Sequence, residues 1–271
     1  MSLPNDERPR RPRTIAELRA VAQPDEVRSR KNAEHWTAAL YLRDLSPYVT
    51  WLLLRTSISA NGVTGLMILS GWAVAASLLI PGFGGAALAL VLCQVQMLID
   101  CCDGEVARWR KTSSPAGAFL DAVGHYSTEA LIPLALAIRA AGYPFTPDGD
   151  YLWTTLGLAL ALVLVLNKAL NDMVRVARAN FGAPKLTYSD AEMAPTSGLL
   201  AKLRRLARVI PLHRIFHSVE MTMVIFAAAV VGLFIGDQIA MRGVLVILLV
   251  VAVLTLVGHF IAIMTSQRVR A

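Results

Sequence analysis

Three aspartates stand in a part of the chain that is otherwise composed like a membrane segment: Asp100, Asp103 and Asp121. Asp100 and Asp103 share one face of a helix, and Asp121 opens the next predicted helix, where its side chain can meet them. Ionised carboxylates in apolar surroundings need compensating charge, and a bound metal ion supplies it. The spacing therefore predicts a divalent-cation site at one end of two neighbouring helices.

The segment around these aspartates carries a longer pattern, DCCDGEVARWRKTSSPAGAFLDAVGH from Asp100 to His125. It resembles the signature of the CDP-alcohol phosphotransferases, in which D-x-x-D-G-x-x-A-R is followed, after eight residues, by G-x-x-x-D-x-x-x-D. The last position departs from the pattern, because His125 stands where the family has its fourth aspartate. The positions in register are Asp100, Asp103, Gly104, Ala107, Arg108, Gly117 and Asp121.

The resemblance implies an activity and a cofactor. Members of the family transfer a substituted phosphoryl group, phosphatidyl or similar, from a CDP-linked donor to an alcohol and release CMP, in the synthesis of phospholipids or related polyol phosphates. The resemblance also implies a homodimer, and Mg²⁺ or Mn²⁺ as cofactor, with a pair of ions bridging the oxygens of the anionic diphosphate. The implied metal ligands are Asp100, Asp103 and Asp121, with His125 at the fourth position.

His125 leaves the chemistry of the fourth position open. A neutral imidazole can bind a metal ion or accept the proton of the attacking alcohol. Glu129 follows one helical turn beyond His125, where it could orient the imidazole or replace the missing carboxylate. Asp121, His125 and Glu129 are therefore the candidate catalytic residues. The alternative is that the substitution has weakened catalysis or fitted another substrate, leaving a catalytically altered membrane protein that binds CDP or lipid and keeps the metal site.

Small and basic residues beside the aspartates are expected to bind the donor. Gly104 lacks a Cβ, so a phosphate can approach the backbone closely, and Ala107 keeps the next turn of that face narrow. Arg108 offers a forked hydrogen-bond donor to phosphate oxygens. Gly117 lets the second and third spans close on the ligand.

Polar residues in two other predicted spans have two interpretations each. Asn61 and Thr64 serve capping and interhelical hydrogen bonds or, as the resemblance implies, lie close to the nucleotide. Lys168, Arg175 and Arg178 bind an acceptor phosphate, or else Lys168 pairs with a neighbouring aspartate and the arginines extend to lipid headgroups.

The composition is that of an integral membrane protein. The chain has 271 residues, of which 55% are hydrophobic, and a mean hydropathy of +0.53. Its apolar residues are gathered into segments of about 20, the length that crosses a bilayer as a helix. We expect an all-α fold with six transmembrane helices, at about 60–80, 84–104, 115–141, 151–175, 211–235 and 240–264.

The chain divides into three predicted regions. Residues 1–30 are rich in Pro, Arg and Glu without apolar periodicity, which is typical of a basic flexible tail. Residues 31–58 mix aromatic, aliphatic and charged side chains, as expected for a juxtamembrane amphipathic helix at the membrane interface. Residues 59–267 form the expected six-helix membrane domain.

The net charge of +7 is concentrated near the ends of the predicted spans. Basic residues occupy the N-terminal tail, the loops after the second and fourth spans and the C-terminus, whereas the opposite loops are nearly bare. This asymmetry places both termini and the site in the cytoplasm, and a bacterial inner membrane is expected. Because no stacking aromatics accompany the bases, we expect membrane lipids and phosphorylated substrates as partners, and no nucleic acid.

Three stretches, LLLRTSISANGVT, DCCDGEVAR and SSPAGAFLD, look most like the inositol-phosphate-using branch of the family in bacteria and archaea. That branch includes di-inositol phosphate phosphate synthase domains and phosphatidylinositol phosphate synthases. The resemblance implies CDP-diacylglycerol as a donor and a phosphorylated polyol such as inositol phosphate as an acceptor, with a soluble CDP-alcohol as the alternative donor. A cation transporter is a weaker alternative. It predicts carboxylates near the bilayer midplane on discontinuous helices, whereas Asp100 and Asp103 lie at the cytoplasmic end of a predicted helix.

Overall fold

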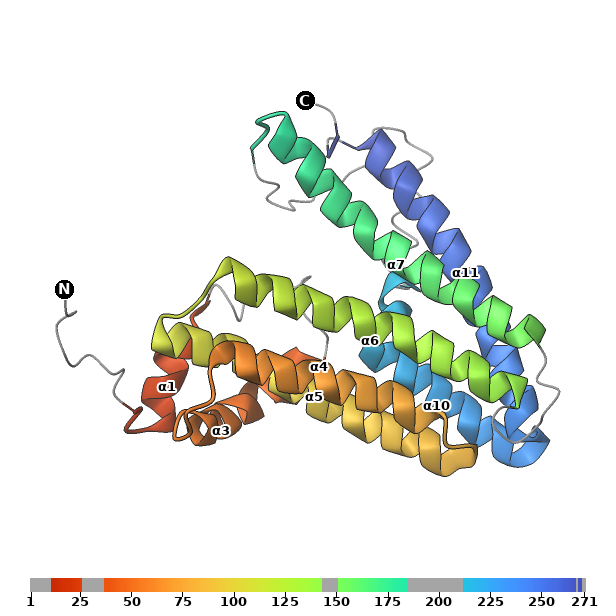
Figure 1. Cartoon of the computed structure of the whole chain (residues 1–271), viewed down its shortest axis with the longest axis horizontal. Coiled ribbons are helices and arrows are strands. Elements are labelled where there is room, and N and C mark those ends of the chain that lie inside the picture. The colour runs from red at the N-terminus through yellow and green to blue at the C-terminus, as the bar shows by residue number, and fades with distance from the viewer. Residues whose placement is uncertain (1–10, 26–36, 143–150, 185–211, 267, 270–271) are drawn as a thin grey trace. The chain divides into compact units, whose positions relative to one another are not determined.

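The expectation of an all-α fold is confirmed (Figure 1). The structure is a computed structural model that describes residues 11–25, 37–142, 151–184, 212–266 and 268–269, and every regular element in these ranges is helical. The elements are α1 (Ile15–Ala22), η1 (Ala38–Leu42), α3 (Arg43–Leu53), α4 (Ala60–Leu78), α5 (Gly82–Arg110), α6 (Pro115–Ala141), α7 (Tyr151–Asn180), η2 (Leu212–Phe216), α10 (Ser218–Ile235) and α11 (Asp237–Thr265).

Five of these helices are long and apolar enough to cross a membrane: α4, α5, α7, α10 and α11. The other predicted span, residues 115–141, is present as the 27-residue helix α6 but is not among the five. Asp121, Glu129 and Arg139 interrupt its apolar sequence. A membrane span at α6, and with it a total of six, stays a prediction.

The chain forms two compact units, and the boundaries between them fall inside α4, α5 and α6. The first consists of Met1–Val74 and Val91–Ser127, and the second of Ala75–Leu90 and Thr128–Ala271. The predicted boundaries at residues 30 and 58 are not tested by this division. Part of the predicted flexible tail carries α1, whereas residues 1–10 and 26–30 lie outside the described residues.

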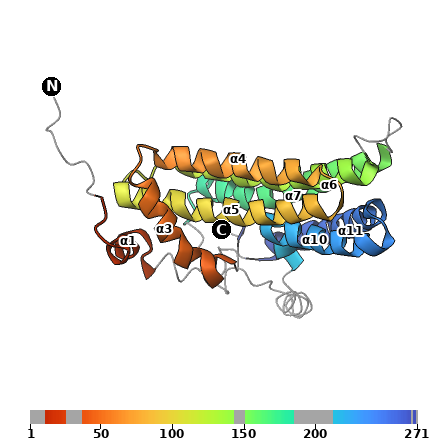
Figure 2. The same cartoon turned by 90° about the horizontal axis from the view of Figure 1, so that it is seen from below.

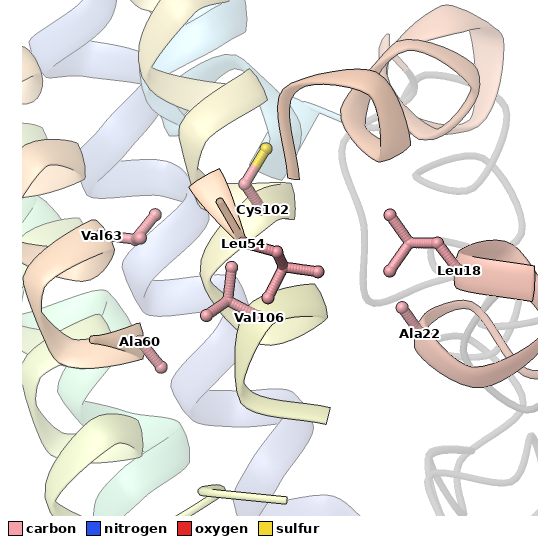
Figure 3. Packing of buried hydrophobic residues seen from close by; sticks show 7 residues of the cluster. All are labelled: Leu18, Ala22, Leu54, Ala60, Val63, Cys102 and Val106. Carbon is pink, nitrogen blue, oxygen red and sulfur yellow. The ribbon is translucent and has the colours of Figure 1, made fainter. Parts of the chain in front are cut away.

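The first unit is held together around the C-terminal half of α5. A cluster of buried apolar side chains joins four segments (Figure 3). An isolated helix as short as α1 is unstable in water, so α1 depends on this packing and on its cap, where the Thr14 hydroxyl accepts from the Glu17 amide at 3.1 Å. The cluster consists of Leu18 and Ala22 from α1, Leu54 after α3, Ala60 and Val63 from α4, and Cys102 and Val106 from α5.

α3 has its polar side inward and its apolar side outward. Ser46 and Thr50 are buried, whereas Leu45, Tyr48 and Leu52 are exposed on another face of the same helix. A helix on the surface of a soluble protein shows the opposite arrangement. Figure 2 shows α1 and α3 on the side of α5 away from α4, so the polar side of α3 faces α5.

A short turn sets α6 against α5. α5 ends where Lys111 adopts a left-handed φ of 53°, and the Thr112 amide donates to the Ala107 carbonyl at 2.9 Å. α6 then begins at Pro115, a favoured first residue of a helix, and the Ser114 hydroxyl accepts from the Gly117 amide at 3.2 Å. This reversal brings the first turns of α6 back beside the last turns of α5.

In the second unit, α7 and α11 run side by side, and α10 packs against α11 (Figure 1). A buried arginine joins three helix ends. Arg139, near the end of α6, donates from Nε to Asp237 Oδ2 at 2.9 Å and from Nη2 to the Gly82 carbonyl at 2.7 Å, and it forms a second bond with Asp237 Oδ1. The ion pair therefore ties the start of α11 and the start of α5 to the end of α6.

Removing one partner of this pair should destabilise the protein. In Asp237→Ala, Arg139 would keep a charged side chain that is 2% exposed without its carboxylate. We expect a loss of about 3 kcal/mol or more in the free energy of unfolding, seen as a lower thermal midpoint of the purified protein in detergent.

The control is Asp172→Ala, which breaks an exposed ion pair with Arg175 in the same unit. An exposed pair contributes less than about 1 kcal/mol, so this variant should unfold close to wild type. Equal shifts in the two variants would show that the Arg139–Asp237 pair is not a main source of stability.

Candidate functional site

The predicted metal site is built on the last turns of α5 and the first turns of α6. One ligand atom each from Asp100, Asp121 and His125 lies within 4.8 Å of the others. His125 Nε2 is 3.1 Å from Asp100 Oδ1 and 3.4 Å from Asp121 Oδ1. Three of the four predicted ligands are thus gathered, and their role as ligands stays a prediction.

The spacing and chemistry of these atoms fit a divalent cation. Neighbouring ligands of an octahedral ion at about 2.1 Å lie about 3 Å apart, close to the two distances from His125 Nε2. Carboxylate oxygens suit Mg²⁺ and Mn²⁺ equally. The imidazole nitrogen fits less well, because Mg²⁺ takes oxygen ligands almost entirely and imidazole is more typical of transition metals.

Asp103, the fourth predicted ligand, contacts α4. The Thr64 hydroxyl donates to Asp103 Oδ2 at 2.8 Å and also lies 3.2 Å from the Ala60 carbonyl. A hydroxyl has one hydrogen, and the shorter bond to an ionisable oxygen is the stronger of the two. Thr64 therefore makes the interhelical hydrogen bond that was one of its two interpretations. Its predicted place beside the nucleotide is not tested.

Arg108 contacts α1. Its Nε donates to the carbonyl of Ala22, the last residue of α1, at 2.5 Å. Its guanidinium also lies over Gly104, where an added Cβ would come within 2.9 Å of Nη1. The missing side chain of Gly104 therefore makes room for Arg108, and contact of either residue with a phosphate stays a prediction.

Gly117 lies close to α4. An added Cβ at Gly117 would lie 3.2 Å from Asn61 Oδ1, so this position faces α4. The prediction that Gly117 lets the second and third spans, α5 and α6, close on the ligand is not tested. Ala107, also assigned to the donor site, is partly buried against the apolar cluster of the first unit.

Glu129 lies in the second unit beside a lysine and a histidine. Its Oε2 is 2.8 Å from Lys168 Nζ, and its Oε1 is 3.4 Å from His217 Nδ1. His217 is not among the predicted site residues; it directly precedes α10 and lies 88 residues from Glu129 in the sequence. Glu129 was expected to orient His125, and that role is not tested.

The other two basic residues of the predicted acceptor site have partners at the end of α7. Arg175 Nη1 is 3.1 Å from Asp172 Oδ1, in an exposed pair. Arg178 donates to the carbonyls of Pro184 at 2.8 Å and Arg268 at 3.0 Å. Binding of a phosphate by either residue stays a prediction.

Glu105 lies inside the motif, but the motif pattern assigns it no role. Glu105 follows Gly104 directly and is fully buried, with hydrogen bonds to three side chains of the N-terminal segments. An acidic residue in an apolar helix is a signal in the sequence. Its partners could not be read from it, because they lie far away along the chain.

Comparison with known proteins gives a family match that includes the motif. The family model described as CDP-alcohol phosphatidyltransferase matches residues 57–254. The bifunctional IPC transferase and DIPP synthase of Rubrobacter xylanophilus is 40% identical over 102 residues, which cover 34% of this chain. The match spans 22% of the length of that relative.

The hydrogen bond from Thr64 should hold Asp103 in place for metal binding. In Thr64→Val the side chain keeps its shape and loses the hydroxyl, and a hydrogen bond to a charged group contributes about 1.5 kcal/mol or more. We expect about a tenfold weaker affinity for Mn²⁺, measured by calorimetric titration of the purified protein with metal alone.

Thr64→Ser is the matched control, because serine retains the hydroxyl and should retain the affinity for Mn²⁺. If Thr64→Val binds Mn²⁺ as tightly as wild type, Asp103 does not depend on Thr64 or does not bind the ion.

Proposed function

Because the chain belongs to the CDP-alcohol phosphatidyltransferase family, we propose that it transfers a substituted phosphoryl group from a CDP-linked donor to the hydroxyl of an alcohol. The observation that carries the proposal is the approach of Asp100, Asp121 and His125 within the matched region. In the reaction, the hydroxyl oxygen forms a bond to phosphorus, the bond from that phosphorus to the oxygen of CMP breaks, and CMP leaves.

Asp100, Asp103 and Asp121 would hold the divalent ions. When bound, these ions supply positive charge to the diphosphate and to the leaving CMP. Thr64 fixes Asp103 from α4, and the turn at 111–114 fixes the approach of Asp121 to Asp100. The proposed donor site also includes Asn61, Gly104, Ala107, Arg108 and Gly117.

His125 is proposed to accept the proton of the attacking hydroxyl. Its Nε2 lies 3.1 Å from Asp100 Oδ1 and 3.4 Å from Asp121 Oδ1, so the two carboxylates can orient the ring. Asp100 and Asp121 would also stabilise the imidazolium that forms. A carboxylate plays the same part when it orients a catalytic histidine.

The substrates are proposed from the resemblance and from the relative. The name of the Rubrobacter protein describes an IPC transferase and DIPP synthase, in agreement with a likeness to inositol-phosphate-using enzymes. We therefore propose CDP-diacylglycerol as donor and a phosphorylated polyol such as inositol phosphate as acceptor. The residues proposed to bind the phosphate of the acceptor are Lys168, Arg175 and Arg178. Glu129 would hold Lys168 in place.

The proposed setting is a bacterial cytoplasmic membrane, with both termini and the site on the cytoplasmic side and the protein as a homodimer. Five apolar helices support membrane insertion, and the basic residues Arg108, Arg110 and Lys111 at the end of α5 support the orientation. The exposed apolar side of α3 fits the surface of a bilayer. Residues 1–30, 31–58 and 59–267 remain the proposed tail, juxtamembrane region and membrane domain.

CMP release tests the proposed function. Purified protein would be supplied with Mn²⁺ or Mg²⁺, CDP-diacylglycerol or a soluble CDP-alcohol, and a panel of phosphorylated and free polyols. CMP should appear only when donor, acceptor and metal are present. The histidine at the fourth motif position favours a second candidate, a membrane protein that binds CDP or lipid without turnover. Metal-dependent binding of CDP without CMP release from any donor would support that candidate.

His125→Ala should separate catalysis from metal binding. Loss of a general base lowers turnover by about 100-fold or more, whereas the three aspartates remain to bind the ion. We expect kcat for CMP release to fall by that amount and the Kd for Mn²⁺ to change by less than about threefold. Asp100→Ala is the comparison, and both activity and Mn²⁺ binding should be lost. Wild-type turnover in His125→Ala would remove His125 from the mechanism.

His125→Asp tests the alternative role of this residue, in which the imidazole binds the ion instead of accepting the proton. The substitution restores the family pattern and replaces a nitrogen by an oxygen, which suits Mg²⁺ better. If the imidazole binds the ion, the ratio of activity with Mg²⁺ to activity with Mn²⁺ should rise relative to wild type. An unchanged ratio would show that this side chain does not contact the ion.

A further inference from the structure

Glu105 is a fully buried carboxylate whose partners come from outside the motif. Its Oε1 accepts from Gln23 Nε2 at 2.8 Å and from the Ser46 hydroxyl at 2.5 Å, and its Oε2 accepts from the Thr50 hydroxyl at 2.6 Å. A carboxylate buried without such donors would be very costly, so all three bonds are needed. An ionised carboxylate accepts only, and here every one of these neighbours donates.

The three donors belong to the two short N-terminal helices. Gln23 caps the end of α1 and lies 82 residues from Glu105 in the sequence, and Ser46 and Thr50 form the inward side of α3. Gln23 Nε2 also donates to the Arg43 carbonyl at 2.7 Å, so α1 and α3 are joined to each other at the same point. Glu105 thus explains why α3 turns its polar side inward.

The contact lies behind the metal site. Residues two positions apart on an α-helix, such as Asp103 and Glu105, are separated by about 200° around its axis. Glu105 therefore faces away from Asp103 and towards α1 and α3. One turn further on, the bond from Arg108 to the Ala22 carbonyl attaches α5 to α1 again. The end of α5 is therefore held on the side opposite to the carboxylates.

We propose that Glu105 is a positioning residue for the phosphotransfer reaction: its hydrogen bonds fix the rotation of the end of α5, and thereby the approach of Asp100 and Asp103 to Asp121 and His125. The inference rests on the proposed function. A rotation of about 20° would move a carboxylate some 6 Å from the helix axis by about 2 Å. A displacement of about 1 Å is enough to lower turnover by about 100-fold.

The test removes the donors and leaves Glu105 in place. Thr50→Val keeps the shape of the side chain, and the double variant Ser46→Ala/Thr50→Val removes both hydroxyls. The matched control is Thr222→Val in α10, since Thr222 is also buried and bonds only to backbone carbonyls, at 2.9 Å and 2.8 Å. Three quantities are measured on folded, monodisperse protein: kcat and KM for CMP release, and the Kd for Mn²⁺ with metal alone.

We expect kcat of the double variant to fall by about tenfold to 100-fold, with an intermediate loss in Thr50→Val. KM for the CDP-linked donor should change by less than about threefold, and the Kd for Mn²⁺ should rise by at least about threefold, because the ligands are misplaced while the donor pocket is intact. Thr222→Val should match wild type. A purely structural contact would lower the yield of folded protein without changing these constants.

Substitution of Glu105 itself distinguishes the effect of its hydrogen bonds from the effect of its negative charge. In Glu105→Gln the amide oxygen can accept from Gln23, and the amide nitrogen can donate to a hydroxyl that reverses its own bond. This variant should therefore keep kcat and the Kd for Mn²⁺ within about threefold of wild type, whereas Glu105→Ala should lose as much as the double variant. If Glu105→Gln is as impaired as Glu105→Ala, the charge acts directly and the positioning role is wrong.

Wild-type kcat and Mn²⁺ affinity in Ser46→Ala/Thr50→Val would also overturn the proposal. The failure of the proposed function has a different result, because wild type would then release no CMP from any donor. In that case the Mn²⁺ titrations of the same variants still test Glu105 independently of turnover.

Discussion

A carboxylate among apolar helices must be compensated, because its desolvation costs more free energy than the packing of any single side chain returns. Four sites in this protein meet the constraint in different ways. Glu105 is bound by uncharged donors, Glu129 by a lysine and a histidine, and Asp237 by a buried arginine. Asp100 and Asp121 both lie close to the imidazole of His125.

These carboxylates fall into two groups, those bound by protein donors and those at the candidate metal site. Arg139 binds both oxygens of Asp237, and three side-chain donors bind the buried Glu105. The side chains of Asp100 and Asp121 are 21% and 46% exposed, and they meet near the ends of their helices. Their oxygens and the His125 nitrogen lie within 4.8 Å of one another, an arrangement that a cation could occupy.

Local patterns made part of this arrangement predictable. Apolar runs of bilayer length gave four of the five apolar helices and α6 with boundaries close to those found, and the start of α6 follows from Ser114 and Pro115. The meeting of Asp100, Asp121 and His125 follows from helical spacing plus one short turn. For α10, the prediction began too early, because residues 212–216 form a separate 3-10 helix and His217 is extended.

Contacts between distant segments were not predictable in the same way. Nothing near Glu105 indicates Gln23, and nothing near Glu129 indicates His217. Arg108 was interpreted through the chemistry of its guanidinium, yet the length of its side chain also lets it reach a backbone carbonyl 86 residues earlier. Residue type and spacing thus identified which side chains are unusual, and tertiary packing decided what they contact.

The inverted helix α3 bears on where this domain begins. The family match starts at residue 57, after α1 and α3, yet Glu105 inside the matched region takes all three of these donors from residues before it. A shortened chain that begins at residue 57 would retain every motif residue. It would also leave Glu105 without its three hydrogen-bond donors. The segment before residue 57 therefore belongs to the same compact unit as the end of α5, although the family match does not include it.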